Sequence, residues 1–191
     1  MMRISTEYRW INHIRFLAFA VIAAALYGCA GPTLPPLQDA SKRGDTQALA
    51  KLLDAGAAIN DHDGDGYTAL HWAAYAGSLD AAKMLVERGA DIESVENDKL
   101  TPLEVAVCYA HGDVAQYLLE KGANVNVQNG SGWTPLHYAA SNGDLGIAEM
   151  LVNHGAEVNA VAKDGHTPLQ VAQEYKTSSV EQMLRQHGAK E

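Results

Sequence analysis

Apolar residues recur with helical spacing along most of the chain. Ala81, Met84 and Leu85 fall on one side of a helix, and the arrangement returns 33 residues later at Val114, Tyr117 and Leu118, and again at Ile147, Met150 and Leu151. A glycine that suits a left-handed helix end follows each segment at the same interval, at Gly56, Gly89, Gly122, Gly155 and Gly188. The pattern predicts short amphipathic helices arranged in a repeat.

Four threonines with the same period mark the starts of a second set of helices. Each opens a similar block: Thr68-Ala-Leu-His, Thr101-Pro-Leu-Glu, Thr134-Pro-Leu-His and Thr167-Pro-Leu-Gln. Threonine is a good N-cap, and proline at the next position lacks an N–H that would be unsatisfied anyway. With its 33-residue period, the chain resembles the ankyrin-repeat family over about residues 37–189. The resemblance implies an all-α fold, an ankyrin-repeat α-solenoid of helix-turn-helix repeats joined by β-turn fingers.

The register of the repeat divides residues 37–191 into five units. The outer two are more polar, as the ends of a solenoid must be, and we expect them to act as caps. The units are an N-terminal cap 37–60, repeats 61–93, 94–126 and 127–159, and a C-terminal cap 160–191.

Repeat 94–126 departs from the pattern at three positions. Lys99 and Ala110 replace glycines of the other repeats, so we expect strained or altered turns there. Gly112 stands where the neighbouring repeats have Leu79 and Leu145. We therefore expect this repeat to pack least well.

The first 28 residues have the features of a secretory signal. Three arginines precede the uncharged apolar run 16–26, which is too short to span a membrane comfortably. The sequence Leu26-Tyr-Gly-Cys29 resembles a bacterial lipobox, which implies cleavage before Cys29 and acylation of that cysteine. An ordinary signal peptide and an uncleaved anchor are the alternatives. Residues 29–36 are Pro-rich and predict an extended tether. The resemblance implies a lipid-anchored protein of the bacterial envelope, facing the periplasm, with the outer membrane favoured because Ala30 follows the cysteine.

The charge of the chain limits the class of partner. The net charge is −9, and the part after residue 28 has 11 basic and 22 acidic residues. Such a body disfavours phosphate backbones, so we expect no nucleic-acid partner, and a basic protein fits better. With Cys29 lipidated, Cys108 has no disulfide partner, so packing alone must hold the fold.

The histidines of the Thr blocks invite a metal or catalytic interpretation. His71 and His137 both occupy the fourth place of the motif, and no second ligand lies at metal spacing on the same helix. The resemblance implies a structural role, in which the imidazole bonds to the threonine hydroxyl and the nearby backbone. We therefore assign a structural function to the motif residues Thr68, His71, Thr101, Thr134, His137 and Thr167.

Two other segments suggest chemistry. Asp61, Asp63 and Asp65, followed by Gly66, resemble the start of an EF-hand loop, but Trp72 stands where that loop needs a glutamate. This leaves a calcium- or ligand-regulated module as the alternative function. Cys108 and His111 could form a thiol–imidazole pair, although no group to orient them or oxyanion hole can be named. We expect no cofactor and no enzyme activity, since no phosphate loop, nucleophile elbow or paired-cysteine zinc motif occurs.

The positions that ankyrin proteins usually devote to partners are rich in aromatic residues. By the resemblance they lie at the finger tips and at the end of the first helix, along one groove. The candidates are Tyr67, Tyr75, Leu100, Tyr109, Trp133, Asn142, His166 and Tyr175. We expect a monomeric scaffold that binds another protein, and the family suggests inhibition of an envelope toxin or support of an envelope enzyme as its role.

Overall fold

The computed structural model describes residues 34–190 and contains ten helices there. The predicted signal peptide, Cys29 and most of the tether lie outside the described residues. The only strand pairing in the described part is an isolated bridge between His62 and Thr68, so the all-α prediction is confirmed. The helices are α2 (Pro36–Arg43), α3 (Thr46–Asp54), α4 (Ala69–Ala76), α5 (Leu79–Glu87), α6 (Pro102–Cys108), α7 (Gly112–Glu120), α8 (Pro135–Asn142), α9 (Leu145–Asn153), α10 (Pro168–Glu174) and α11 (Ser178–Gln186).

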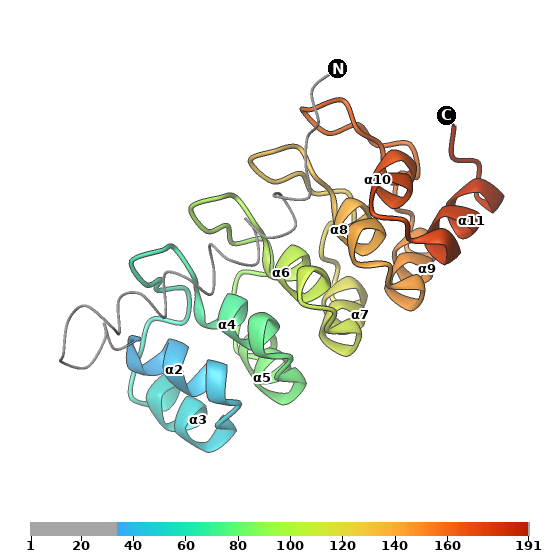
Figure 1. Cartoon of the computed structure of the whole chain (residues 1–191). Coiled ribbons are helices and arrows are strands. Elements are labelled where there is room, and N and C mark those ends of the chain that lie inside the picture. The colour runs from blue at the N-terminus through green and yellow to red at the C-terminus, as the bar shows by residue number, and fades with distance from the viewer. Residues whose placement is uncertain (1–33, 191) are drawn as a thin grey trace, which may run out of the picture. The chain divides into compact units, whose positions relative to one another are not determined.

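The helices form five pairs that stack in two rows (Figure 1). The inner row is α2, α4, α6, α8 and α10, and the outer row is α3, α5, α7, α9 and α11; each helix packs on its neighbour in the row and on its pair mate. The loops that join the pairs project from the side of the inner row (Figure 1). Each helix of residues 34–190 is too short or too polar to cross a membrane.

The helix boundaries follow from the capping residues. Thr68, Thr101 and Thr167 accept a hydrogen bond from the third backbone N–H of α4, α6 and α10, as N-caps do. The first pair differs from our expectation by one residue, because α2 begins at Pro36, which we placed in the tether. Proline is well suited to a first helical position, and Pro35 takes the place of the threonine in the register.

Two rows of leucines form the centre of the core. Leu70, Leu103, Leu136 and Leu169 come from the inner helices, and Leu85, Leu118, Leu151 and Leu184 come from the outer ones. All eight are at most 1% exposed. Members of each row are 33 residues apart, so one sequence period becomes one continuous apolar layer along the stack.

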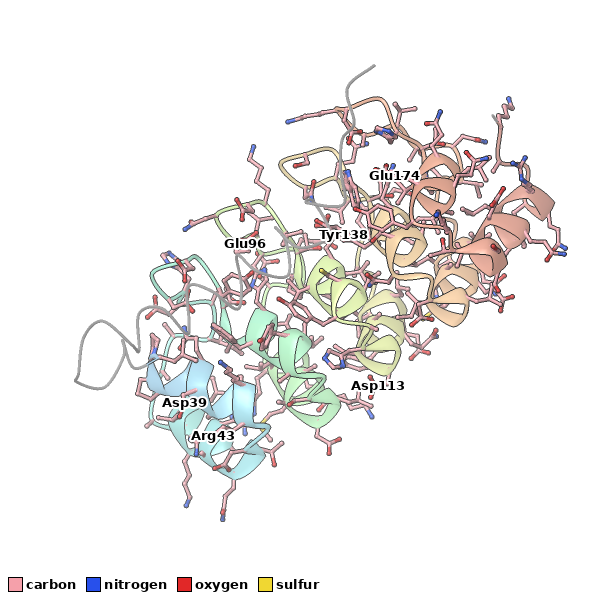
Figure 2. All side chains as sticks on the ribbon, viewed as in Figure 1. Asp39, Arg43, Glu96, Asp113, Tyr138 and Glu174 are labelled. Carbon is pink, nitrogen blue, oxygen red and sulfur yellow. The ribbon has the colours of Figure 1, made fainter. Side chains whose placement is uncertain are left out.

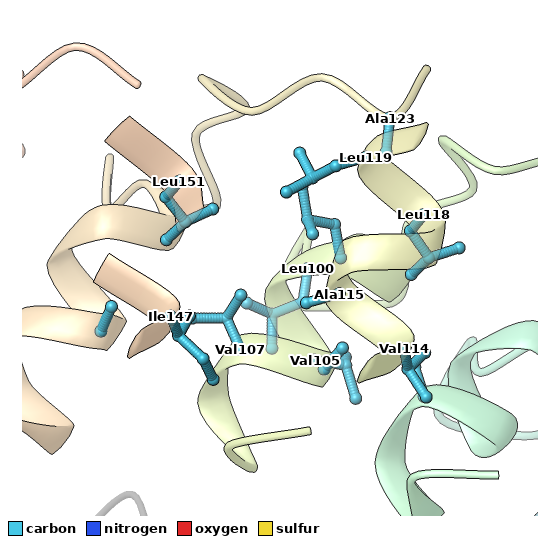
Figure 3. Close-up of a cluster of buried hydrophobic side chains, with 14 of the residues drawn as sticks. Leu100, Val105, Val107, Val114, Ala115, Leu118, Leu119, Ala123, Ile147 and Leu151 are labelled. Carbon is cyan, nitrogen blue, oxygen red and sulfur yellow. The ribbon is translucent and has the colours of Figure 1, made fainter. Parts of the chain in front are cut away.

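The expectation that repeat 94–126 packs least well is wrong. Five of the nine residues of α7 are buried, compared with three of nine in each of α5 and α9. Figure 3 shows buried hydrophobic side chains of repeat 94–126 and the next one, including Val107 and Val114. Ile147 of the next repeat faces the space beside Gly112, since a Cβ placed on that glycine would lie 3.4 Å from its Cγ1. The predicted backbone departure is present: Lys99 and Ala110 have φ angles of 65° and 59°.

Candidate functional site

Each of the two histidines of the Thr blocks ties its own repeat to the next unit. His71 is fully buried, and its Nδ1 accepts a hydrogen bond from the Thr68 N–H at 3.2 Å. Nε2 therefore carries the ring proton and donates to the carbonyl of Leu100, 3.0 Å away in the next loop. His137 repeats this arrangement, with Nε2 3.1 Å from the carbonyl of His166. Burial lowers the pKa of His71 to about 4, so at neutral pH the ring is an uncharged structural link.

Glu104 occupies the same place in repeat 94–126 and bonds differently. One carboxyl oxygen accepts from the Thr101 N–H at 3.0 Å, which closes the capping box. The other oxygen, Oε1, is buried and has no hydrogen-bond partner. Burial raises the pKa of this carboxyl to about 7. The link between repeats that the histidines provide is therefore missing at this position.

The acidic loop 61–67 uses its central carboxylate to build the turn. Asp63 accepts hydrogen bonds from the N–H groups of Asp65 and Tyr67 on one oxygen and from the Trp72 indole, at 2.8 Å, on the other. Glu96 and Asn129 do the same for the backbone of the next two loops, one and two periods later. In residues 34–190 no three His, Cys, Asp or Glu side chains are grouped to hold a metal ion. The fold thus uses the Asp63 carboxylate to build the turn, and the calcium alternative stays a prediction.

The loops are also hydrogen-bonded to one another. The N–H of Asn97 donates to the carbonyl of Asp65 at 3.2 Å, and that of Gly130 donates to the carbonyl of Asp98 at 3.0 Å. Lys163 continues the series with an N–H bonded to the carbonyl of Ser131. This ladder fixes the spacing of the four loops, so the surface beside them is formed before any partner arrives.

A row of aromatic rings runs from α4 to the end of α6. The ring centroids of Trp72 and Tyr75 are 5.3 Å apart, and those of Tyr75 and Tyr109 are 4.6 Å apart, both edge to face. Tyr67 lies against Trp72 at 5.3 Å. We call the partly exposed rings Trp72, Tyr75 and Tyr109 the aromatic row. A separate pair, Trp133 and Tyr138, lies at the third loop with centroids 5.2 Å apart.

Comparison with protein families agrees with this geometry. A model of ankyrin repeats in three copies matches residues 37–129, and a second ankyrin-repeat model matches residues 118–172. The folded unit is an ankyrin-repeat solenoid. Ankyrin repeats are interaction modules, and proteins built from them are typically scaffolds without enzyme activity. Comparison with curated proteins gives no significant match.

The structure separates the eight predicted partner-binding residues of the ankyrin surface into three groups. Tyr67 and Leu100 are only 4% and 8% exposed, so the prediction that they line an open groove is wrong. Both belong to the hydrophobic core of the stack. Asn142 is exposed, but its amide donates to the carbonyls of Val107 and Cys108 at the end of α6. The remaining five stay predictions and are partly exposed: Tyr75, Tyr109, Trp133, His166 and Tyr175.

Sequence reasoning missed two aromatic residues of this surface, Trp72 and Tyr138. Both occupy the fifth place of their Thr block, directly after the structural histidine, and both are partly exposed. In Figure 2, Tyr138 on α8 and Glu96 in the second loop both lie on the loop side of the stack, whereas Asp113 lies at α7. The other two Thr blocks have Val105 and Val171 at this position, and both are only 1% exposed, so the motif gave no consistent signal of exposure.

Cys108 and His111 do not form an activated thiol pair. Burial raises the pKa of the Cys108 thiol to about 11, so the group is protonated at neutral pH and a poor nucleophile. His111 Nε2 instead lies 3.0 Å from the carbonyl of Tyr75, which places this ring between two ankyrin repeats. The pair is better explained as packing than as chemistry.

Proposed function

We propose that this protein is a lipid-anchored ankyrin scaffold that binds another protein. The proposed binding surface is formed by the partly exposed aromatic residues beside the loops, and we call it the loop-side surface. The observation that carries the proposal is the partial exposure of aromatic residues there, namely Tyr75, Tyr109 and Trp133. Tyrosine and tryptophan supply much of the binding energy of interfaces because they bury a large area at little entropic cost. Their place beside hydrogen-bonded loops supports binding to a preformed surface.

The anchor rests on the sequence before residue 34. The lipobox-like Leu26-Tyr-Gly-Cys29 supports acylation of Cys29, and acyl chains on the sulfur and on the new N-terminus hold a protein firmly at a bilayer. We place the protein in the bacterial envelope, facing the periplasm, as a monomer. A scaffold there would restrain a toxin or support an envelope enzyme.

Affinity capture tests the binding surface. The tagged full-length chain and the variants Tyr75→Ala and Trp133→Ala are each purified from host membranes, and the partner that comes with them is measured. We expect each variant to bind the partner about tenfold or more weakly than the wild type and therefore to recover less of it. Glu149→Ala is the matched control, because Glu149 is exposed on α9 of the outer row. Equal recovery of the same partner by all four proteins would remove the loop-side surface from the proposal.

Cell fractionation tests the anchor independently. Cys29→Ser should move the protein from the membrane to the soluble fraction and abolish incorporation of labelled palmitate. Cys108→Ser changes the only other cysteine and should leave both measurements as in the wild type. A Cys29→Ser protein that stays in the membrane fraction and remains labelled would contradict acylation at this residue.

A further inference from the structure

The aromatic row already holds a positive charge. The ammonium of Lys42, at the end of α2, lies 4.5 Å from the ring centroid of Trp72 and 5.5 Å from that of Tyr75. Lys42 is exposed, and within residues 34–190 it forms no ion pair with a carboxylate. Aromatic faces attract cations through their electron-rich centres, and this attraction is weak for an exposed lysine. The ring faces of Trp72 and Tyr75 therefore point toward a site that a cation can occupy and leave.

Negative charge is concentrated at the same end of the surface. Loops 61–67 and 94–100 contain five carboxylates and one lysine, and Asp61, Asp65 and Asp98 are exposed. Loops 127–133 and 160–166 contain only Asp164 and Lys163, which cancel. The first of these loops reaches the aromatic row, since the Trp72 indole donates to the carboxylate of Asp63 at 2.8 Å. The cation-binding rings and the acidic loops thus belong to one half of the surface.

We infer that the partner presents a basic segment, and that an arginine or lysine side chain of that segment replaces Lys42 on the aromatic row. This inference rests on the proposed function, because it names the chemistry of the protein that the scaffold binds. The guanidinium or ammonium lies over Trp72 and Tyr75, and neighbouring basic residues face Asp65 and Asp98. Opposite charges also speed the encounter, since the whole domain is acidic.

A peptide of alternating arginine and serine is the probe, with a glutamate–serine peptide as its counterpart. Binding to the full-length protein in detergent is measured by calorimetry and by tryptophan fluorescence. We expect only the arginine peptide to bind. Tyr75→Leu should weaken binding about tenfold, and Lys42→Met should tighten it severalfold because the competing cation is gone. The double variant Asp65→Lys/Asp98→Lys should bind most weakly. Its charge-matched control is Asp80→Lys/Glu149→Lys, which changes two exposed acids of the outer row.

The outcomes separate this inference from the proposed function. No binding of the arginine peptide at low salt overturns it. It is also overturned if Tyr75→Leu and Lys42→Met leave the affinity unchanged, since binding would then reflect net charge alone. Thermal melting verifies that each variant is folded. If capture of a partner depends on Trp133 and not on the aromatic row, that result would support the loop-side surface as the binding site and contradict only the inference of a basic segment.

Discussion

Repeat 94–126 and the repeats on either side of it differ in how the fourth residue of the Thr block is bonded. His71 and His137 use one ring nitrogen for their own helix cap and the other for a carbonyl of the next loop. Glu104 closes its cap in the same way but leaves Oε1 buried and without a partner. Capping requires only an acceptor at this place, whereas linking two repeats also requires a donor. A glutamate can satisfy the second requirement only when it is protonated.

The two kinds of repeat should therefore respond to pH in opposite directions. The pKa of His71 is lowered from 6.5 to about 4, so its contribution to stability is complete above pH 6.5 and is lost as the pH falls toward 4. The pKa of Glu104 is raised from 4.5 to about 7, so its contribution is complete below pH 4.5 and is lost as the pH rises to 7. Neighbouring repeats of the stack thus carry one group that lowers stability as the pH falls and one that lowers it as the pH rises.

Removing each side chain tests the comparison with the largest expected effect. His71→Ala leaves a cavity, removes the partner of the Thr68 N–H and removes one of the two donors to the Leu100 carbonyl, which keeps the Glu96 N–H. We expect a loss of roughly 3–5 kcal/mol at pH 7. Glu104→Ala should cost clearly less, because it also removes a buried carboxyl that lacks a partner. Urea denaturation followed by circular dichroism measures both. Equal losses would mean that the link between repeats adds nothing to the cap.

Replacing Glu104 by a neutral amide should remove the loss of stability that occurs as the pH rises. We expect Glu104→Gln to be more stable than the wild type by roughly 2–3 kcal/mol at pH 8 and nearly equal to it at pH 4.5, as follows from the raised pKa. Gln170 shows that an amide fits this place, since its Oε1 accepts from the Thr167 N–H at 2.9 Å. Melting temperatures across this pH range provide the measurement. A stability difference that does not grow with pH would rule out ionisation of Glu104 as its cause.

The same substitution series can reverse the pH response. Glu104→His introduces the group of the neighbouring repeats, so its stability relative to Glu104→Gln should fall below pH 6.5, by roughly 1–2 kcal/mol at pH 5. The control is His71→Gln, which should flatten the acid side of the wild-type profile. If Glu104→His shows no acid-side loss, the site would differ from those of His71 and His137 in more than the side chain.

The sequence predicted the repeated parts of the fold well, because every repeat poses the same physical problem. A threonine cap, a buried leucine and a terminal glycine occur at fixed intervals, and one interval gives one helix pair. The structural role of His71 likewise follows from its place in the motif, and its two ring nitrogens are bonded as expected.

The surface was harder to predict, because exposure depends on neighbouring repeats. Tyr67 and Leu100 stand at a finger position that looks open in one repeat, but each is covered in the stack. Lys42 gave no signal, since its contact with Trp72 joins residues of two units through space. The burial around Gly112 was also missed, because the side chain that lies beside this glycine is Ile147 of the next repeat.

The left-handed residues of repeat 94–126 provide the smallest test of the comparison. Ala110, with φ 59°, stands where the flanking repeats have Gly77 and Gly143. A Cβ raises the energy of this conformation, and the greater freedom of glycine in the unfolded chain offsets only part of the gain. We expect Ala110→Gly to stabilise the protein by roughly 0.5–1 kcal/mol, measured by urea denaturation. Ala55→Gly is the control, because Ala55 has φ −79° and should lose stability on the same change. A loss at both positions would show that Ala110 is not strained, and the glycines of the flanking repeats would then reflect local crowding, such as that between Gly77 and His111.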